Sequence, residues 1–256
     1  YKLAEDEVWI VPNASNADSV ITRLTQLLPS EITLENLHTD YGIIAVQGPQ
    51  SPKLMSELGL AADIAYMSAT KTDYQGTEVL LCRSGYTGET GFEIIAPNSV
   101  LLAIWQSAIN NGAKPIGLGA RDTLRLEMGY PLHGNDLSPS ITPLEAGLSW
   151  AIGWDKPRFE GAETLKAQKV AGATRKRVGL LMRDRGIPRS DMSVLRDGVT
   201  VGLTTSGTFS PTLKQGIALA LVSPDVKVGE ILKLDVRGRE LEVEVVKLPF
   251  VQPSTK

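Results

Sequence analysis

The chain has 256 residues, of which 42% are hydrophobic and 21% charged, with a formal net charge of −3. This length is enough for one large domain or two ordinary ones. Because 26 basic residues face 29 acidic ones, the composition excludes a protein that wraps nucleic acid through a general basic excess. The apolar runs are too short to span a bilayer, and the single cysteine, Cys82, excludes an intrachain disulfide framework.

Helix and strand signals alternate in the first part of the chain. The sequence EVWIVP is rich in β-branched and aromatic side chains, which favour a strand, and the following NASN supplies short polar side chains that cap helices. The expected elements are, in order, a strand at 7–12, a helix at about 17–28, strands at 32–37 and 42–47, and a short helix after Pro49. Mixed elements of this kind indicate an α+β domain.

A glycine-rich turn, SGYTGETG at 84–91, lies between two β-type segments at 79–83 and 92–95. Three of its glycines can adopt the positive φ angles that tight turns need, so the sequence predicts a hairpin. Two amphipathic helices are expected next, at 99–111 and 117–128, each followed by a glycine that can end it.

The segment 158–173 is polar and charged, which indicates a linker. Beyond it, turns separate short strands expected at 177–182, 192–195, 199–206, 216–222, 231–236 and 240–247. This spacing predicts a small β-barrel or sandwich. We therefore expect an α+β region at 1–157, a linker at 158–173 and a C-terminal β-barrel domain at 174–256. The basic stretch at 166–177 is most simply solvated, and an acidic partner is the alternative.

Glu93 stands between Phe92 and Ile94 directly after the glycine-rich turn. A carboxylate in an apolar strand is costly unless it is paired or binds a ligand. Strand alternation places Glu93 on the face opposite Phe92 and Ile94, so a solvent-facing glutamate is the alternative. Both interpretations stay open at this point.

A second charged group lies on the helix expected at 117–128. Arg121 and Arg125 are four residues apart and share a face, where like charges repel unless carboxylates or a ligand lie between them. Asp122 and Glu127 could neutralise them internally, and an anion site is the alternative. The GLGARD sequence lacks the third glycine of a dinucleotide fingerprint. These residues indicate at most a ligand-binding enzyme.

Four motifs resemble the aminomethyltransferase, or T-protein, of the glycine cleavage system. They are VPNASN at 11–16, GYTGETGFE at 85–93, the long IGLGARDTLRLEMGYPLHGNDLSPSITPLEAGLSWAIGW at 116–154, and TVGLTTSGTFSPTLKQGIALALV at 200–222. The matching segments occur in the same order as in the family and extend from the start of the chain to about residue 246. The resemblance implies an α+β, folate-binding aminomethyltransferase fold, here incomplete, followed by a C-terminal β-barrel domain.

The resemblance also implies chemistry and residues. The enzyme would move an aminomethyl group from the lipoyl arm of the H-protein to tetrahydrofolate and release ammonia, with no metal and no flavin. Glu93 would accept hydrogen bonds from a pterin edge, aromatic side chains would wall the flat rings, and arginines would bind the acidic tail or the carrier protein. The folate-binding residues implied are Trp9, Val11, Asn13, Tyr86, Glu93, Arg121, Trp150 and Arg189.

The family's catalytic aspartate is expected about four residues upstream of Tyr1. The resemblance therefore assigns no catalytic residue within the chain and implies an N-terminally truncated fragment, inactive or nearly so by itself. A non-catalytic module that binds folate or the H-protein is the alternative. Expected partners are the lipoylated H-protein and folate, with neither nucleic acid nor membrane. The low cysteine count and the lack of a visible transit segment favour a cytoplasmic location.

Overall fold

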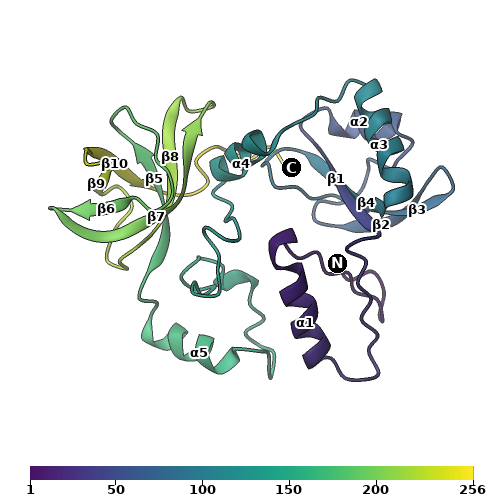
Figure 1. Ribbon diagram of the computed structural model, residues 1–256, viewed down its shortest axis with the longest axis horizontal. Helices are drawn as coiled ribbons and strands as arrows, with labels where there is room; N and C mark the ends of the chain where they lie inside the picture. The colour runs from purple at the N-terminus through teal and green to yellow at the C-terminus, as the bar shows by residue number, and fades with distance from the viewer. Residues whose placement is uncertain (256) are drawn as a thin grey trace. The chain divides into compact units, whose positions relative to one another are not determined.

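The computed structural model describes residues 1–255, which form two compact units (Figure 1). The first comprises Tyr1–Ile116 and the last residues from Ser254, and the second comprises Gly117–Pro253. Each unit has its own hydrophobic core. Within the part of the chain described, no helix is both long and apolar enough to cross a membrane.

The first unit is built on a four-stranded antiparallel sheet in the order β1-β4-β3-β2. Its elements are η1 (Ala14–Asn16), α1 (Ala17–Leu27), β1 (Tyr41–Gln47), α2 (Ser51–Glu57), β2 (Ala69–Tyr74), β3 (Thr77–Cys82), β4 (Gly91–Pro97) and α3 (Asn98–Asn110). One sheet face packs against α2 and α3, where Met55 and Ile104 are fully buried against Phe92 and Ile94. The expected helices at 17–28 and 99–111 are confirmed, as is the strand at 42–47.

Three local predictions in this unit are wrong. Residues 7–12 join no sheet but fold back on the start of the chain, with Trp9 N donating to Tyr1 O at 2.8 Å and Leu3 N to Glu7 O at 2.9 Å. Residues 32–37 form a bend followed by coil, because strand propensity alone does not provide a neighbouring strand to pair with. Asn13 and Asn16 precede helices without any side-chain capping bond.

The predicted hairpin of β3 and β4 is confirmed, with Cys82 opposite Glu93. The three glycines of its turn were all expected to adopt positive φ angles, but two of them have another role. Only Gly88 has positive φ, at 75°, whereas a Cβ at Gly85 or Gly91 would collide with the Gln47 side chain. That side chain is held in the turn because Gln47 Nε2 donates to Ser84 O at 3.1 Å and to Phe92 O at 3.0 Å.

The second unit contains a closed barrel in the order β10-β5-β8-β7-β6-β9, which confirms the predicted C-terminal barrel. Its elements are α4 (Leu118–Glu127), η2 (Ser149–Ala151), α5 (Ala162–Ala171), β5 (Lys176–Met182), β6 (Ser193–Arg196), β7 (Val199–Ser210), β8 (Gln215–Val222), β9 (Ile231–Asp235) and β10 (Glu240–Val246). Inward side chains such as Val194, Leu234 and Val243 fill the barrel. Helix α5 lies within the segment expected as a linker, and α4 packs against β7 and β8.

Candidate functional site

Glu93 lies in the middle of β4, opposite Ala45 of β1 and Cys82 of β3. Strand alternation places it away from Phe92 and Ile94, as expected. This second face of the sheet is nevertheless partly covered, because Leu80, Cys82 and Ile95 are buried there under Leu3 and Trp9. Glu93 is therefore half-buried rather than simply solvent-facing.

The glycine-rich turn brings a hydroxyl group to this carboxylate. Ser84 Oγ donates to Glu93 Oε2 at 2.6 Å, and Tyr1 OH lies 3.1 Å from Ser84 Oγ. Burial raises the pKa of Tyr1 to about 12, with smaller contributions from the neighbouring Cys82 and Glu93. Burial also raises the pKa of the Cys82 thiol, with a smaller contribution from Glu93. Glu93 thus sits in a polar cluster whose other members are neutral at pH 7.

Trp9, the first predicted site residue, packs on the same face of the sheet. Its ring meets Tyr41 edge to face at 5.6 Å between centroids, and its Nε1 donates to Glu7 Oε1 at 2.9 Å. Glu7 also bonds Lys71 Nζ at 2.9 Å, and this pairing lowers the pKa of Glu7. Trp9 is therefore held in place by the sheet and by an ion pair.

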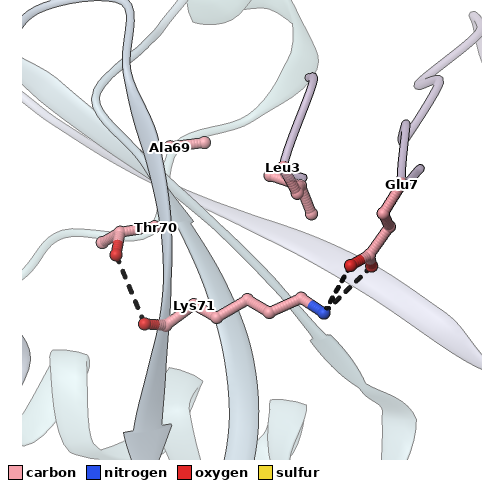
Figure 2. A pocket seen from close by; sticks show the side chains of 5 residues that line it. All are labelled: Leu3, Glu7, Ala69, Thr70 and Lys71. Carbon is pink, nitrogen blue, oxygen red and sulfur yellow. Dashed lines mark hydrogen bonds and ion pairs between the residues drawn. The ribbon is translucent and has the colours of Figure 1, made fainter. Parts of the chain in front are cut away.

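The Glu7–Lys71 pair borders a cavity of about 250 Å³ (Figure 2). Leu3 and Glu7 from the N-terminal segment line it on one side, and Ala69, Thr70 and Lys71 from β2 line it on the other. The ion pair satisfies both charged groups of this cavity. None of the predicted site residues lines it.

The other predicted residues of this unit come from the N-terminal segment and from the glycine-rich turn. Val11 and Asn13 follow Trp9 and are exposed, and Tyr86 lies in the glycine-rich turn, two residues after Ser84. Of this set, the structure brings Trp9 and Glu93 onto one sheet face. Sequence reasoning missed Ser84, although a hydroxyl at the base of a hairpin turn, near the strand position opposite Glu93, was a usable signal.

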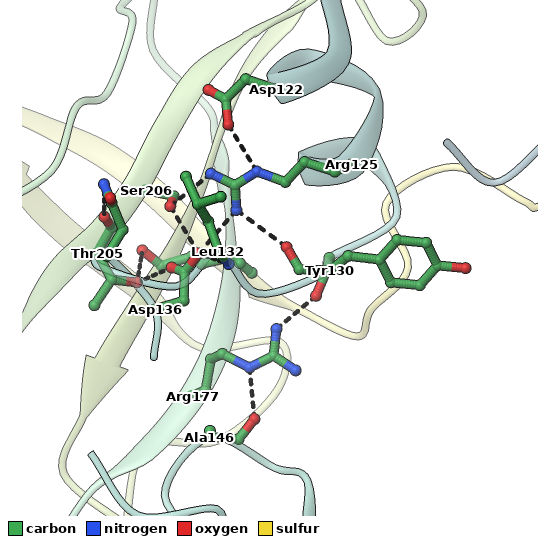
Figure 3. Close-up of polar contacts among 12 residues, drawn as sticks. Asp122, Arg125, Tyr130, Leu132, Asp136, Ala146, Arg177, Thr205 and Ser206 are labelled. Atoms are coloured by element: carbon green, nitrogen blue, oxygen red, sulfur yellow. Dashed lines mark hydrogen bonds and ion pairs between the residues drawn. The ribbon is translucent and has the colours of Figure 1, made fainter. Parts of the chain in front are cut away.

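In the second unit, Arg125 is buried to 2% exposure in a network of polar groups (Figure 3). Its Nε donates to Asp122 at 2.7 Å, and its Nη1 donates to Asp136 at 2.8 Å. The same Nη1 reaches Tyr130 O at 3.0 Å, and Nη2 donates to Ser206 Oγ at 2.8 Å. Four of the five N–H groups of this buried guanidinium are bonded within the protein, two of them to carboxylates, so it is a structural ion pair and not an exposed anion site.

The predicted neutralisation of the arginine pair is partly wrong. Asp122 does bind Arg125, but Glu127 is buried elsewhere and accepts bonds from Ser210 Oγ at 2.5 Å and Thr212 Oγ1 at 3.0 Å. The missing carboxylate is Asp136, which also bonds Thr205 and Ser206 on β7. These side chains fix α4 on the barrel.

The three predicted residues of the second unit are exposed. Arg121 lies on α4, Trp150 lies in η2 with 83% of its surface exposed, and Arg189 follows β5 with Nη1 at 3.4 Å from Gly207 O. Exposed guanidinium groups can bind carboxylates in two parallel hydrogen bonds. In residues 1–255, no three metal-ligating side chains gather into a group that could hold a metal ion.

Comparison with known families identifies both parts of the chain. Residues 1–156 match the GCVT N-terminal domain, and residues 175–252 match the glycine cleavage T-protein C-terminal barrel domain. A domain of the first type followed by such a barrel defines the class to which this protein belongs.

Whole-chain relatives give the particular family. The chain is 49% identical to the aminomethyltransferase of Parafrankia sp. (strain EAN1pec) and 47% identical to that of Mycolicibacterium paratuberculosis, over its whole length and 72% and 71% of theirs. A crystal structure of glycine cleavage system aminomethyltransferase T from Bartonella henselae superposes with a TM-score of 0.86 at 33% identity, covering 94% of this chain and 68% of that one. The chain belongs to the aminomethyltransferase family, the T-proteins of glycine cleavage.

Proposed function

We propose that this chain binds tetrahydrofolate and takes part in moving an aminomethyl group to it from the lipoyl arm of the H-protein, with release of ammonia. Membership of the aminomethyltransferase family supports the reaction class. The observation that carries the proposal is the half-buried Glu93 carboxylate, which Ser84 holds on a partly covered face of the first unit's sheet.

Glu93 has the chemistry that a pterin edge needs. The pterin offers a ring N–H and an exocyclic amino group side by side, and one carboxylate can accept from both. Ser84 takes one position on Oε2, and within this unit no described donor reaches Oε1. A carboxylate oxygen has two lone pairs, so both oxygens keep room for a ligand.

The remaining roles follow from side-chain chemistry. We assign Trp9 and Tyr86 to the flat ring system, with Val11 and Asn13 beside them, because aromatic faces stack on planar heterocycles. Trp150 is a further aromatic candidate, and its exposure leaves the indole face accessible. We assign Arg121 and Arg189 to the acidic folate tail or to an acidic carrier protein such as the H-protein.

Calorimetric titration with 5-formyltetrahydrofolate tests the folate assignment. Glu93→Gln should weaken binding by about 10- to 100-fold, the loss expected for charge-assisted hydrogen bonds of about 1.5–3 kcal/mol. Glu78→Gln is the matched control, because Glu78 lies on β3 of the same sheet and is exposed, 3.6 Å from Lys71. Equal affinity in Glu93→Gln and in the unaltered chain would overturn the role of Glu93.

Transfer is measured separately from binding, as methylenetetrahydrofolate formed with loaded H-protein. Product formation supports the full reaction. Folate or H-protein binding without product supports the alternative, a binding module without chemistry of its own.

A further inference from the structure

Ser84 and Tyr1 form a short hydrogen-bonded chain that ends on the Glu93 carboxylate. An ionised carboxylate only accepts hydrogen bonds, so the Ser84 hydroxyl must donate its single proton to Glu93 Oε2, 2.6 Å away. Ser84 Oγ can then only accept from Tyr1 OH at 3.1 Å. The protons of both hydroxyl groups therefore point towards Glu93.

The surroundings hold this chain in one arrangement. Gln47 Nε2 donates to Ser84 O at 3.1 Å and fixes the backbone at the base of the turn. Tyr1 is held by its backbone pairing with Trp9, where Trp9 N donates to Tyr1 O at 2.8 Å. Because burial raises the pKa of Tyr1 to about 12, its hydroxyl keeps its proton throughout the neutral range. Donor chains of this kind strengthen one another in partly buried sites.

We propose that Ser84 is a positioning residue, which fixes the Glu93 carboxylate so that both its oxygens face the edge of a pterin ring, with Tyr1 fixing Ser84 in turn. This inference rests on the proposed function, since it concerns the same ligand. A flexible glutamate side chain loses rotamer freedom when it binds, and a hydroxyl that holds it beforehand reduces that loss.

The first test combines variants with a ligand analogue. Ser84→Ala removes the hydroxyl but keeps the backbone carbonyl that Gln47 binds, and Ser84→Thr keeps a hydroxyl. We expect Ser84→Ala to weaken 5-formyltetrahydrofolate binding about tenfold, equal to about 1.4 kcal/mol, and Ser84→Thr to stay within about twofold. Tyr1→Phe should lie between them, at roughly threefold. Ser56→Ala on α2 is the matched control, because the Ser56 hydroxyl donates to Pro52 O within its own helix and the change leaves the Ser56 backbone intact.

The 2-desamino analogue of the same folate separates positioning from structural damage. It lacks the amino group that pairs with one carboxylate oxygen, so the Ser84→Ala loss should shrink to about threefold or less with this ligand. Equal losses with both ligands would show that Ser84 acts only on the fold. No loss with the parent folate would also overturn the proposal.

A measurement without ligand separates the positioning role of Ser84 from the proposal that the chain binds folate. The ¹³C relaxation of the Glu93 side chain should show lower order in Ser84→Ala than in the unaltered chain, with Glu78 unchanged as the internal control. An unaltered chain that binds no folate would overturn the proposed function, while this relaxation would still decide whether Ser84 holds Glu93. Unchanged order at Glu93 would overturn the positioning role whatever the ligand.

Discussion

At the residue scale, Glu93 and Arg125 show two ways of keeping a charge in apolar surroundings. Arg125 is fully buried, and two carboxylates, a hydroxyl and a carbonyl accept from four of its five N–H groups. Glu93 is half-buried and has one fixed donor, the Ser84 hydroxyl. Removing a partner from a buried, bonded charge is strongly destabilising, whereas a half-buried carboxylate with unused acceptor positions can bind a ligand.

The buried pair of Arg125 and Asp136 predicts a large loss of stability when one partner is removed. Asp136 is fully buried, so Asp136→Asn should lower the free energy of unfolding by about 3–5 kcal/mol, because the buried Arg125 charge then keeps only the half-exposed Asp122 as an ion-pair partner among the described residues. Asp122→Asn is the matched control, since Asp122 is 47% exposed and its pair should contribute about 1 kcal/mol or less. Urea denaturation of both variants measures the difference, and equal losses would contradict it.

The raised pKa of Tyr1 predicts a loss of folding stability at alkaline pH. Its folded-state pKa of about 12 is above the unfolded value near 10, so folding favours the protonated phenol. The stability that Tyr1 contributes is therefore complete below pH 10 and is lost as the pH rises to 12. Ultraviolet titration of the unaltered chain against Tyr1→Phe measures this ionisation. A Tyr1 transition near pH 10 in the folded chain would contradict the prediction.

At the element scale, the turn between β3 and β4 shows what its sequence pattern encodes. Its glycines were expected to provide positive φ angles, yet only Gly88 does so. Gly85 and Gly91 instead make room for Gln47, whose amide bonds the turn from β1. The GYTGETG pattern is therefore a packing requirement between strands as much as a turn.

Gly91→Ala tests this packing requirement. The added methyl group would overlap the Gln47 side chain, so we expect a loss of about 1–3 kcal/mol in the free energy of unfolding. Gly117→Ala is the matched control, because Gly117 has open space around it and a negative φ of −80°. In a double-mutant cycle, the combination with Gln47→Ala should cost less than the sum of the two single changes. Additive losses would contradict this account.

At the scale of the whole molecule, surface ion pairs predict how stability falls in acid. Arg196 bonds Glu230 at 2.7 Å and also pairs with Asp225, and these contacts lower the pKa of both carboxyl groups. A lowered pKa means that the contribution is present above the unfolded values, near 4, and is lost as the pH falls through the folded ones.

The urea concentration at the unfolding midpoint should therefore decrease as the pH is lowered from about 4 to about 2. Arg196→Gln should make this decrease with pH shallower. Arg185→Gln is the control for removal of one positive charge, because Arg185 is exposed and no ion pair of it occurs among the described residues. The same slope in both variants would contradict the assignment.

The sequence by itself determined the family, the helices at 17–28 and 99–111, and the strands of the C-terminal barrel. These features depend on local periodicity, turn residues and long motifs, which the chain carries in order. Its prediction failed at 7–12 and 32–37, because a strand needs a partner that local propensity does not specify. The eight folate-binding residues and the upstream aspartate stay predictions.

Only the tertiary structure decided the partners of the charged residues. Asp136 and Ser206 reach Arg125 from 11 and 81 positions away, and Gln47 reaches the turn at Ser84 from 37 positions away. Ser84 is only nine residues from Glu93, but its hydroxyl meets the carboxylate because β3 and β4 pair in one register. Composition and spacing indicate which charged and polar side chains need hydrogen-bond partners. Strand register and helix packing then determine which of these side chains come into contact.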